Sequence, residues 1–310
     1  MPEPESYSYQ RYLVAKQTVD ARALNLRVWQ RFVTKLAETD SPLQVLEIGA
    51  GIGATAQRVL EAVPTRFDQL EYTLLDVNSA NLAVSRKRLR DWLEQHEHWS
   101  LKEEGEEVTA TKEGGVVVTL RFVEGDLFEY AATRSQQSYD ALISQAVFDL
   151  LPVPATLDSL RPLLVDGGLW YLPIHFDGVT AFEPPIQSDL DDRIERLYHQ
   201  SMRRDDAEEG GIAGAQTGRR LLSALPATGA SLLEAGSSDW IVHPNENEYP
   251  SDEAYFLHHI LHFVESELSG HPKLDANAFD SWLQRRREQI ESGTLIYIAH
   301  QLDILAEQGG

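Results

Sequence analysis

The sequence has no cysteine among its 310 residues. Without thiols, the chain cannot form a disulfide framework, a thiolate metal site or a cysteine nucleophile. The amino-terminal stretch MPEPESYSYQRY lacks the apolar core of a signal peptide, and no run reaches the ~18 apolar residues of a membrane span. These absences predict a cytoplasmic protein with no membrane partner. His258, His262 and Glu265 share one helix face but lack a His-Glu-x-x-His pattern, so we expect no bound metal either.

Basic residues are also scarce, lysine in particular. The chain has 27 Lys and Arg against 49 Asp and Glu, which gives a formal net charge of −22. Because nucleic-acid binders depend on a basic surface, this balance argues against a nucleic-acid partner. Two interpretations of the acidic bias stay open. It suits the high-salt cytoplasm of a halophile, and it also suits an ordinary acidic protein from an arginine-preferring genome.

Strands and helices alternate along most of the chain. Strands that are buried on both faces appear as continuous apolar runs, as LQVLEI does at 43–48. Helices appear as apolar residues at helical spacing. The predicted helices include 10–38, 78–96 and 155–164. The predicted strands include 43–48, 72–77, 169–176 and a strand with its outgoing loop over 139–148, and a hairpin is predicted over 108–126. This alternation predicts an α/β protein with a doubly wound parallel sheet.

The second half of the chain is less regular. The segments 177–218 and 244–292 are predicted to be helical additions that cover the ligand edge of the sheet, and 293–305 begins as a final strand. No internal repeat and no long linker divides the sequence. We therefore expect one domain over 1–310, with a helical cap at 1–40.

The stretch LEIGAGIGAT follows directly on the first predicted strand. In open α/β sheets, ligands bind beyond the carboxyl ends of the strands, and glycine lets the backbone approach a ligand closely. Gly49, Gly51 and Gly53 therefore predict a ligand-binding loop. The same stretch fits the dinucleotide pattern G-x-G-x-x-G/A, with Ala54 in the last place, so the loop alone does not choose the cofactor.

Acidic residues near three strand ends narrow the choice. Asp76 ends the second strand, where a carboxylate can accept hydrogen bonds from both ribose hydroxyls. Asp126 follows the third, where it can accept from the exocyclic amine of adenine, with Leu127 or Phe128 against the ring. Glu47 precedes the glycines inside an apolar strand. There it would repel a pyrophosphate and suit a ligand with an ammonium and a sulfonium group.

The motifs VLEIGAGIG, LLDVN, VEGDLF and SQAVFDLLP together resemble the class I S-adenosylmethionine-dependent methyltransferases, over residues 43–175. The resemblance implies a seven-stranded sheet whose last strand, here LIYIAHQL, runs antiparallel. It also implies S-adenosylmethionine as cofactor and S-adenosylhomocysteine as product. The implied cofactor-binding residues are Glu47, Gly49, Gly51 and Gly53 at the methionine part, Asp76 at the ribose, Asp126 and Leu127 at the adenine, Ser144 and Gln145 at the methionine end, together with Ala50, Val77 and Asn78.

Methyl transfer from a sulfonium is an in-line displacement that needs alignment and, for oxygen acceptors, a base. The candidate catalytic residues are His175 at the end of the fifth strand, and Tyr198 and His199 on a predicted lid helix. For all three, ordinary packing is the competing interpretation. The acceptor is expected to be a small molecule, because the Asn/Asp-Pro-Pro-aromatic motif of DNA amino-methylating enzymes is absent at 144–148.

Two other functional classes stay open at this point. The glycine pattern also suits an oxidoreductase that uses NAD. A protein that binds S-adenosylmethionine without transferring its methyl group would carry the same loop. The sequence does not distinguish a monomer from a homodimer.

Overall fold

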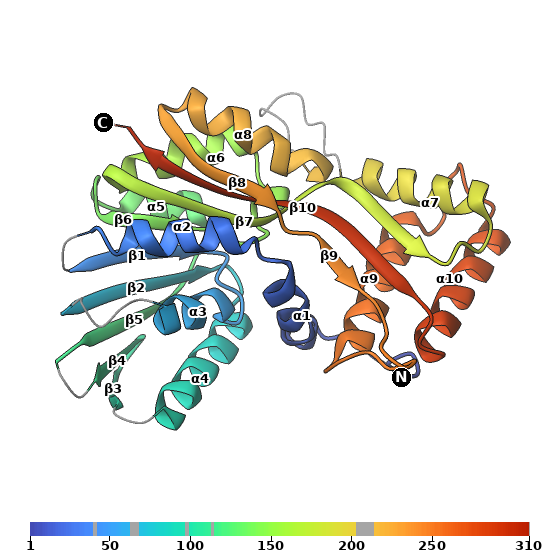
Figure 1. The fold of residues 1–310 in the computed structure, drawn as a ribbon, viewed down its shortest axis with the longest axis horizontal. Helices are drawn as coiled ribbons and strands as arrows, with labels where there is room; N and C mark the ends of the chain where they lie inside the picture. Colours follow the sequence, from blue (N-terminus) through green and yellow to red (C-terminus); the bar gives the residue numbers. More distant parts are fainter. Residues whose placement is uncertain (40–41, 63–67, 97–98, 113–114, 203–213, 310) are drawn as a thin grey trace.

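The computed structural model describes residues 1–310 except 40–41, 63–67, 97–98, 113–114, 203–213 and 310 (Figure 1). Within these residues, ten strands form one sheet in the order β3-β4-β5-β2-β1-β6-β7-β10-β8, with β9 paired to β10. The strands are β1 (Leu43–Ile48), β2 (Gln69–Asp76), β3 (Trp99–Glu104), β4 (Glu107–Lys112), β5 (Val117–Glu124), β6 (Tyr139–Ile143), β7 (Leu164–Glu183), β8 (Ala230–Ser237), β9 (Trp240–Val242) and β10 (Ile296–Gln308). The helices are α1 (Tyr9–Ala23), α2 (Leu26–Leu36), α3 (Ala54–Ala62), α4 (Ser79–Gln95), α5 (Leu127–Thr133), α6 (Val153–Leu160), α7 (Ser188–Ser201), α8 (Thr217–Ala227), α9 (Glu253–Leu268) and α10 (Ala276–Glu291).

The centre of the sheet is parallel. Strands β5, β2, β1, β6 and β7 run parallel, and β10 lies antiparallel between β7 and β8. The expected antiparallel last strand is therefore confirmed. The expected count of seven strands is too low, because β3 and β4 extend one edge and β9 pairs with the outer part of β10. The charged, mostly exposed side chains of β3 suit an edge strand, which other chains must not pair with.

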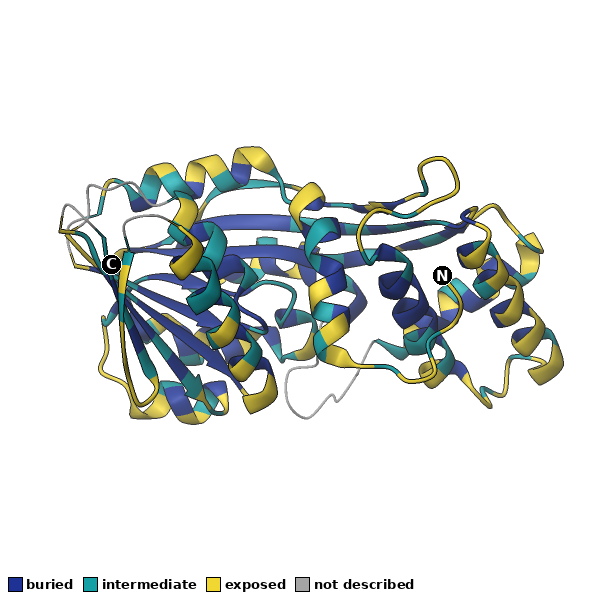
Figure 2. Cartoon of the chain, turned by 90° about the horizontal axis from the view of Figure 1, so that it is seen from below, coloured by how far each residue is buried: buried dark blue, intermediate teal, exposed yellow. Residues whose placement is uncertain are grey.

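Helices cover both faces of the sheet, which confirms the doubly wound architecture. Helices α2, α3 and α4 bury Phe32, Val59 and Leu89 against one face. Helices α5, α6 and α8 bury side chains such as Tyr130 and Leu157 against the other. Figure 2 shows the result as buried strands between helices whose outer sides are exposed. This burial of apolar surface is the main favourable contribution to folding.

A third core lies beyond the centre of the sheet. Strands β7 and β10, 20 and 13 residues long, extend out of the sheet to a second group of helices (Figure 1). This helical lobe, made of α7, α9 and α10 with β9 and α1, is packed around Tyr198, Trp240 and Tyr297. The segments 177–218 and 244–292, predicted as additions at the ligand edge, supply its three outer helices.

Residues 10–38 were predicted as one amphipathic helix, and this prediction is wrong. Helix α1 stops before Leu24, which leaves the helical conformation at φ −47° and ψ 129°. The Asn25 side chain then begins α2 by accepting a hydrogen bond from the Val28 N–H at 3.2 Å. As a result, α1 joins the helical lobe, whereas α2 packs on the sheet.

Two features are missing from the part of the chain that the structure describes. No helix there is both long and apolar enough to cross a membrane. No group of three or more histidine or acidic side chains is placed there to hold a metal ion. The glycine-rich stretch at 206–218, predicted as a loop, lies largely outside the described residues.

Candidate active site

The glycine-rich loop after β1 has a backbone that other residues adopt with difficulty. Gly49, Gly51 and Gly53 have φ of +64°, +54° and +73°. A Cβ atom at Gly49 would overlap the side chain of Val147, and one at Gly53 would overlap Ser85. Gly49 and Gly51 line the cavity described below. All three glycines are thus favoured by the backbone conformation, and Gly49 and Gly53 also by close packing.

Asp76, the last residue of β2, connects three segments at the strand ends. Its Oδ2 atom accepts a hydrogen bond from the Gly51 N–H at 2.8 Å, and its Oδ1 atom accepts one from the Asn78 N–H at 2.8 Å. The side-chain amide of Asn81 donates to the same Oδ1 at 3.3 Å. Asp76 is buried and also lines the cavity. The carboxylate therefore fixes the glycine-rich loop while it faces the ligand space.

Asp126 and Leu127 lie where β5 gives way to α5. Asp126 caps the helix, because its Oδ1 atom accepts hydrogen bonds from the Phe128 N–H at 2.8 Å and the Glu129 N–H at 3.1 Å. Both Asp126 and Leu127 line the cavity, as does Val77, whose side chain is unusually exposed at 71%. This end of the cavity thus offers a carboxylate together with two apolar side chains.

One cavity of about 720 Å³ runs from the strand ends to the helical lobe. This volume is within the range of small-molecule sites. Of the predicted site residues, its lining includes Gly49, Gly51, Asp76, Val77, Asn78, Asp126, Leu127, Gln145 and Tyr198. The lining does not include Glu47, Ala50, Gly53, Ser144, His175 and His199. The structure thus brings together most of the residues predicted from separate strand ends.

Glu47 is directed away from the cavity. Successive side chains of a strand point to opposite faces, and on β1 it is Ile48 that lines the cavity. Glu47 instead accepts a hydrogen bond from the Tyr72 hydroxyl at 2.8 Å beneath the loop. Burial raises the pKa of Glu47 to about 7, despite the opposing effects of the hydroxyls of Tyr72 and Thr55. The structure therefore gives this acid a partner inside the protein.

Gln145 lines the cavity and takes part in a polar network. Its amide group donates to Asp20 at 2.8 Å and accepts from the Thr55 hydroxyl at 3.1 Å. Asp20 also pairs with Lys16 at 2.5 Å and accepts from the Trp240 indole N–H at 2.9 Å. Lys16 and Trp240 line the cavity beside Gln145. Sequence reasoning gave Asp20 no role, although Lys16 and Asp20 stand one helical turn apart, the spacing at which ion pairs form.

The predicted catalytic residues are placed differently from one another. His175 is fully buried on the face of β7 opposite the cavity, which its neighbours Ile174 and Phe176 line. Burial lowers the pKa of His175 to about 4. His199 also lies outside the cavity lining, with its ring centre 5.7 Å from that of Phe176. Tyr198 lines the cavity, and burial raises the pKa of its hydroxyl.

Asp149 is a site residue that sequence reasoning missed. It lies in the short 3-10 turn Phe148–Leu150 after β6 and lines the cavity. Burial raises the pKa of Asp149 to about 7, and the nearby Thr217 hydroxyl, the Phe176 N–H and the Lys16 charge offset only part of this effect. The signal in the sequence was an acid inside the apolar stretch VFDLL, just beyond a strand end.

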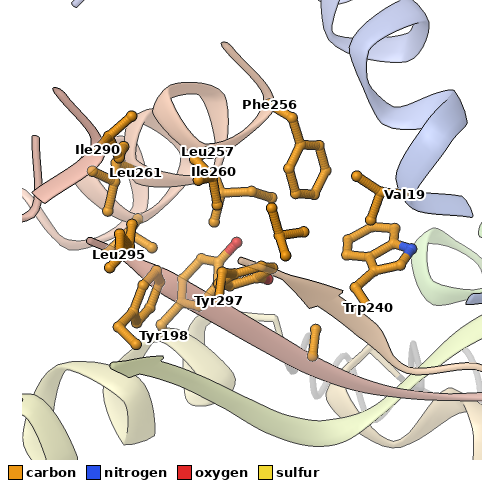
Figure 3. Close-up of a cluster of buried hydrophobic side chains, with 14 of the residues drawn as sticks. Val19, Tyr198, Trp240, Phe256, Leu257, Ile260, Leu261, Ile290, Leu295 and Tyr297 are labelled. Carbon is orange, nitrogen blue, oxygen red and sulfur yellow. The ribbon is translucent and has the colours of Figure 1, made fainter. Parts of the chain in front are cut away.

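The lobe end of the cavity is aromatic. Its lining includes Phe176, Tyr198, Trp240, Phe263 and Tyr297. Figure 3 shows Tyr198, Trp240 and Tyr297 in the core that α7, β9 and β10 share with α9. Aromatic side chains provide large apolar contact surfaces with fixed geometry. This end of the cavity is thus suited to a flat, apolar molecule.

Residues 46–170 match the model of a methyltransferase domain family. These residues contain the glycine-rich loop, Asp76, Asp126 and Asp149, and their strands form the parallel centre of the sheet. The resemblance to class I methyltransferases is thereby confirmed over this part of the chain.

Other similarities are weaker or shorter. A citrinin polyketide synthase from Monascus ruber is 35% identical over 63 residues, which are 20% of this chain and 2% of that protein. A solved structure from Bacillus halodurans, assigned as a methyltransferase, aligns over 90% of this chain and 98% of its own at 12% identity and a TM-score of 0.48. A Geobacter sulfurreducens S-adenosylmethionine-dependent methyltransferase, solved with S-adenosyl-L-homocysteine, aligns over 96% and 97% at 11% identity and a TM-score of 0.45.

Proposed function

We propose that the protein is an S-adenosylmethionine-dependent methyltransferase that acts on a small-molecule acceptor. The observation that carries this proposal is a single cavity with two kinds of wall. In an in-line displacement the acceptor atom must be aligned with the methyl group of the donor, so both molecules must bind in one enclosed space. The strand ends provide the polar wall for the donor, and the helical lobe provides the aromatic wall for the acceptor.

The polar wall matches the chemical groups of the cofactor. Asp76 would accept hydrogen bonds from the ribose hydroxyls, and Asp126 from the adenine amine, with Leu127 and Val77 against the ring. At the other end, Gln145 and Lys16 would hold the amino-acid part, where the Lys16 ammonium attracts a carboxylate. When bound, the cofactor supplies an electrophilic methyl group on a sulfonium.

The charges of the cavity favour this cofactor over NAD. Among the described residues, its lining has four acids, Asp76, Asp126, Asp149 and Glu267, and one cation, Lys16. S-adenosylmethionine is net positive, because its sulfonium and ammonium charges outweigh its carboxylate. NAD carries a pyrophosphate, which these acids would repel. The charge of the cavity therefore supports the methyl donor.

Calorimetric titration with S-adenosylhomocysteine and with NAD tests the proposal. We expect the first to bind and the second not to bind. The Asp76→Asn variant should bind S-adenosylhomocysteine about tenfold more weakly, since a hydrogen bond to a charged group is worth about 1.5–3 kcal/mol. Asp158→Asn, an exposed site on α6, is the matched control and should bind normally. Binding of NAD alone would overturn the proposal.

A small-molecule acceptor separates this function from cofactor binding without catalysis. Incubation with S-adenosylmethionine and a metabolite extract should yield S-adenosylhomocysteine, whereas a binding protein would yield none. The net charge of −22 supports an acceptor other than nucleic acid.

We also expect a cytoplasmic location. Unfolding at a series of potassium chloride concentrations tests the halophile interpretation. Loss of structure below molar salt supports it, and indifference to salt contradicts it.

A further inference from the structure

Asp149 has a carboxylate oxygen that nothing in the described protein uses. Its Oδ1 atom is shielded from solvent and has no hydrogen-bond partner among the described residues, because the nearby Thr217 hydroxyl donates its proton to the Gly214 carbonyl oxygen at 2.9 Å. Its Oδ2 atom has one long contact, 3.5 Å from the Phe176 N–H. A buried acceptor without a partner costs free energy unless a ligand satisfies it. Because Asp149 lines the cavity, the group that satisfies it is expected to come from the ligand.

The charged groups around Asp149 are already paired or neutral. Lys16 on α1 is its nearby cation, but Lys16 is paired with Asp20. On β7, Asp177 is engaged by the Arg219 guanidinium at 2.8 Å. His175, also on β7, stays neutral near neutral pH, because burial lowers its pKa to about 4. Among the described residues of this neighbourhood, Asp149 is therefore the group that is free to exchange a proton with a ligand.

Among the described residues, the rest of the acceptor end offers no comparable base. Tyr12, Tyr198 and Tyr297 line the cavity, and burial raises the pKa of each hydroxyl, so they stay protonated near neutral pH. Glu267 lies at an exposed position near the end of α9, where water competes for it. In contrast, the pKa of Asp149 is raised to about 7, close to the value at which a general base is most effective.

We propose that Asp149 is the general base that removes the proton from the hydroxyl group of an apolar aromatic acceptor. This inference rests on the proposed methyltransferase function. The acceptor oxygen forms a bond to the methyl carbon while the carbon–sulfur bond breaks, and the bonding electrons of that bond stay on sulfur. The hydroxyl proton passes to Asp149 Oδ1 and later to water. The aromatic wall selects the ring, and Asp149 selects the hydroxyl.

A matched pair of probes tests the inference before the natural acceptor is known. We would titrate the S-adenosylhomocysteine complex with 2-naphthol, which carries a hydroxyl, and with 2-methoxynaphthalene, which carries none. For the wild type, binding of 2-naphthol should be about tenfold tighter one pH unit above neutrality than one unit below, because only the ionised carboxylate accepts the hydroxyl proton. Binding of 2-methoxynaphthalene should not change.

Two variants assign this pH dependence to one residue. Asp149→Asn should bind 2-naphthol with no pH dependence. Glu195→Gln is the control, because burial raises the pKa of Glu195 to about 7 as well, although Glu195 does not line the cavity. This variant should keep the pH dependence of the wild type. With S-adenosylmethionine present, Asp149→Asn should form 2-methoxynaphthalene about a hundredfold more slowly than the wild type.

The outcomes separate this inference from the proposed function. If the wild type fails to bind S-adenosylhomocysteine, the proposed function fails. If S-adenosylhomocysteine binds but 2-naphthol binds no more tightly than 2-methoxynaphthalene, the hydroxyl acceptor is wrong and the proposed function stands. If Asp149→Asn keeps the pH dependence of the wild type, Asp149 is not the base.

Discussion

The side-chain amide of Gln145 donates a hydrogen bond to Asp20 at 2.8 Å and so joins the loop after β6 to helix α1. The two residues are 125 positions apart in the sequence. Lys16 and Trp240 meet the same Asp20 carboxylate from α1 and β9. Helix α1 also lines the cavity, and the network fixes it to the loop after β6.

Replacing Gln145 with alanine should loosen this wall. We expect affinity for S-adenosylhomocysteine to fall about tenfold, because the variant loses the hydrogen bond that Gln145 would make to the charged amino-acid part of this ligand. Amide hydrogens of α1 should also exchange faster than in the wild type. Calorimetry and hydrogen exchange measure the two effects. Gln284→Ala, on the exposed side of α10, is the control and should alter neither. Unchanged exchange in Gln145→Ala would show that other contacts hold α1.

Gly49→Ala should destabilise the protein more than the same substitution at Gly105. Both glycines have positive φ, +64° and +58°, so both variants strain the backbone, at about 1 kcal/mol. A Cβ at Gly49 also overlaps Val147, whereas nothing lies within 4 Å of one at Gly105. Overpacking adds about 1–3 kcal/mol. Urea unfolding measures the difference, and Val147→Ala should recover part of the loss. Equal costs at both sites would contradict the packing argument.

The pKa of Glu47 makes stability depend on pH. Folding raises it from 4.5 to about 7, so the native state keeps a proton that the unfolded chain releases in this window. Stability therefore falls as pH rises from 4.5 to 7. Glu47→Gln has no proton to lose there, and should gain up to about 3 kcal/mol relative to the wild type across the window. Urea unfolding at both ends measures this gain. Glu61→Gln, an exposed site on α3, is the control and should follow the wild type. Parallel profiles of stability against pH for Glu47→Gln and the wild type would refute the prediction.

Residues at strand ends were predictable from the sequence because the sheet brings them together. The carboxyl ends of parallel strands meet at one edge, so Asp76 and Asp126 reach the same cavity whatever the details of the helices. Side-chain direction was harder to predict. Glu47 and His175 lie on strands, where a shift of one residue moves a side chain to the opposite face. The apolar runs that identified these strands are buried on both faces, so they carry no alternation to show which face is which.

Features of irregular segments could not be predicted from the sequence for another reason. Asp149 lies in a short turn between a strand and a helix, and the groups near it, on Lys16, Phe176 and Thr217, come from distant parts of the chain. Likewise, the apolar spacing of residues 10–38 continues across the break at Asn25, so periodicity alone merged two helices. The Asn25 side chain caps the start of α2, but the apolar spacing of residues 10–38 was the stronger signal in the sequence.

The ion pair between Arg286 and Asp191 should be the most sensitive polar contact of the helical lobe. The guanidinium is fully buried and donates to Asp191 at 2.7 Å, and the Trp282 indole donates to the same oxygen at 2.6 Å. Arg286→Met leaves the Asp191 charge buried without a counter-ion, and we expect a loss of about 3–5 kcal/mol in the free energy of unfolding. Lys87→Ala breaks an exposed pair with Asp91 and should cost less than about 1 kcal/mol.

Urea unfolding of Arg286→Met and Lys87→Ala compares the two costs. A double variant tests why Arg286→Met is destabilised. Arg286→Met combined with Asp191→Leu removes both charges, so it should recover much of the stability that Arg286→Met alone loses. The unpaired carboxylate, rather than the missing arginine packing, would then account for the cost. A double variant no more stable than Arg286→Met would assign the loss to packing in the lobe, which also supplies the aromatic wall of the cavity.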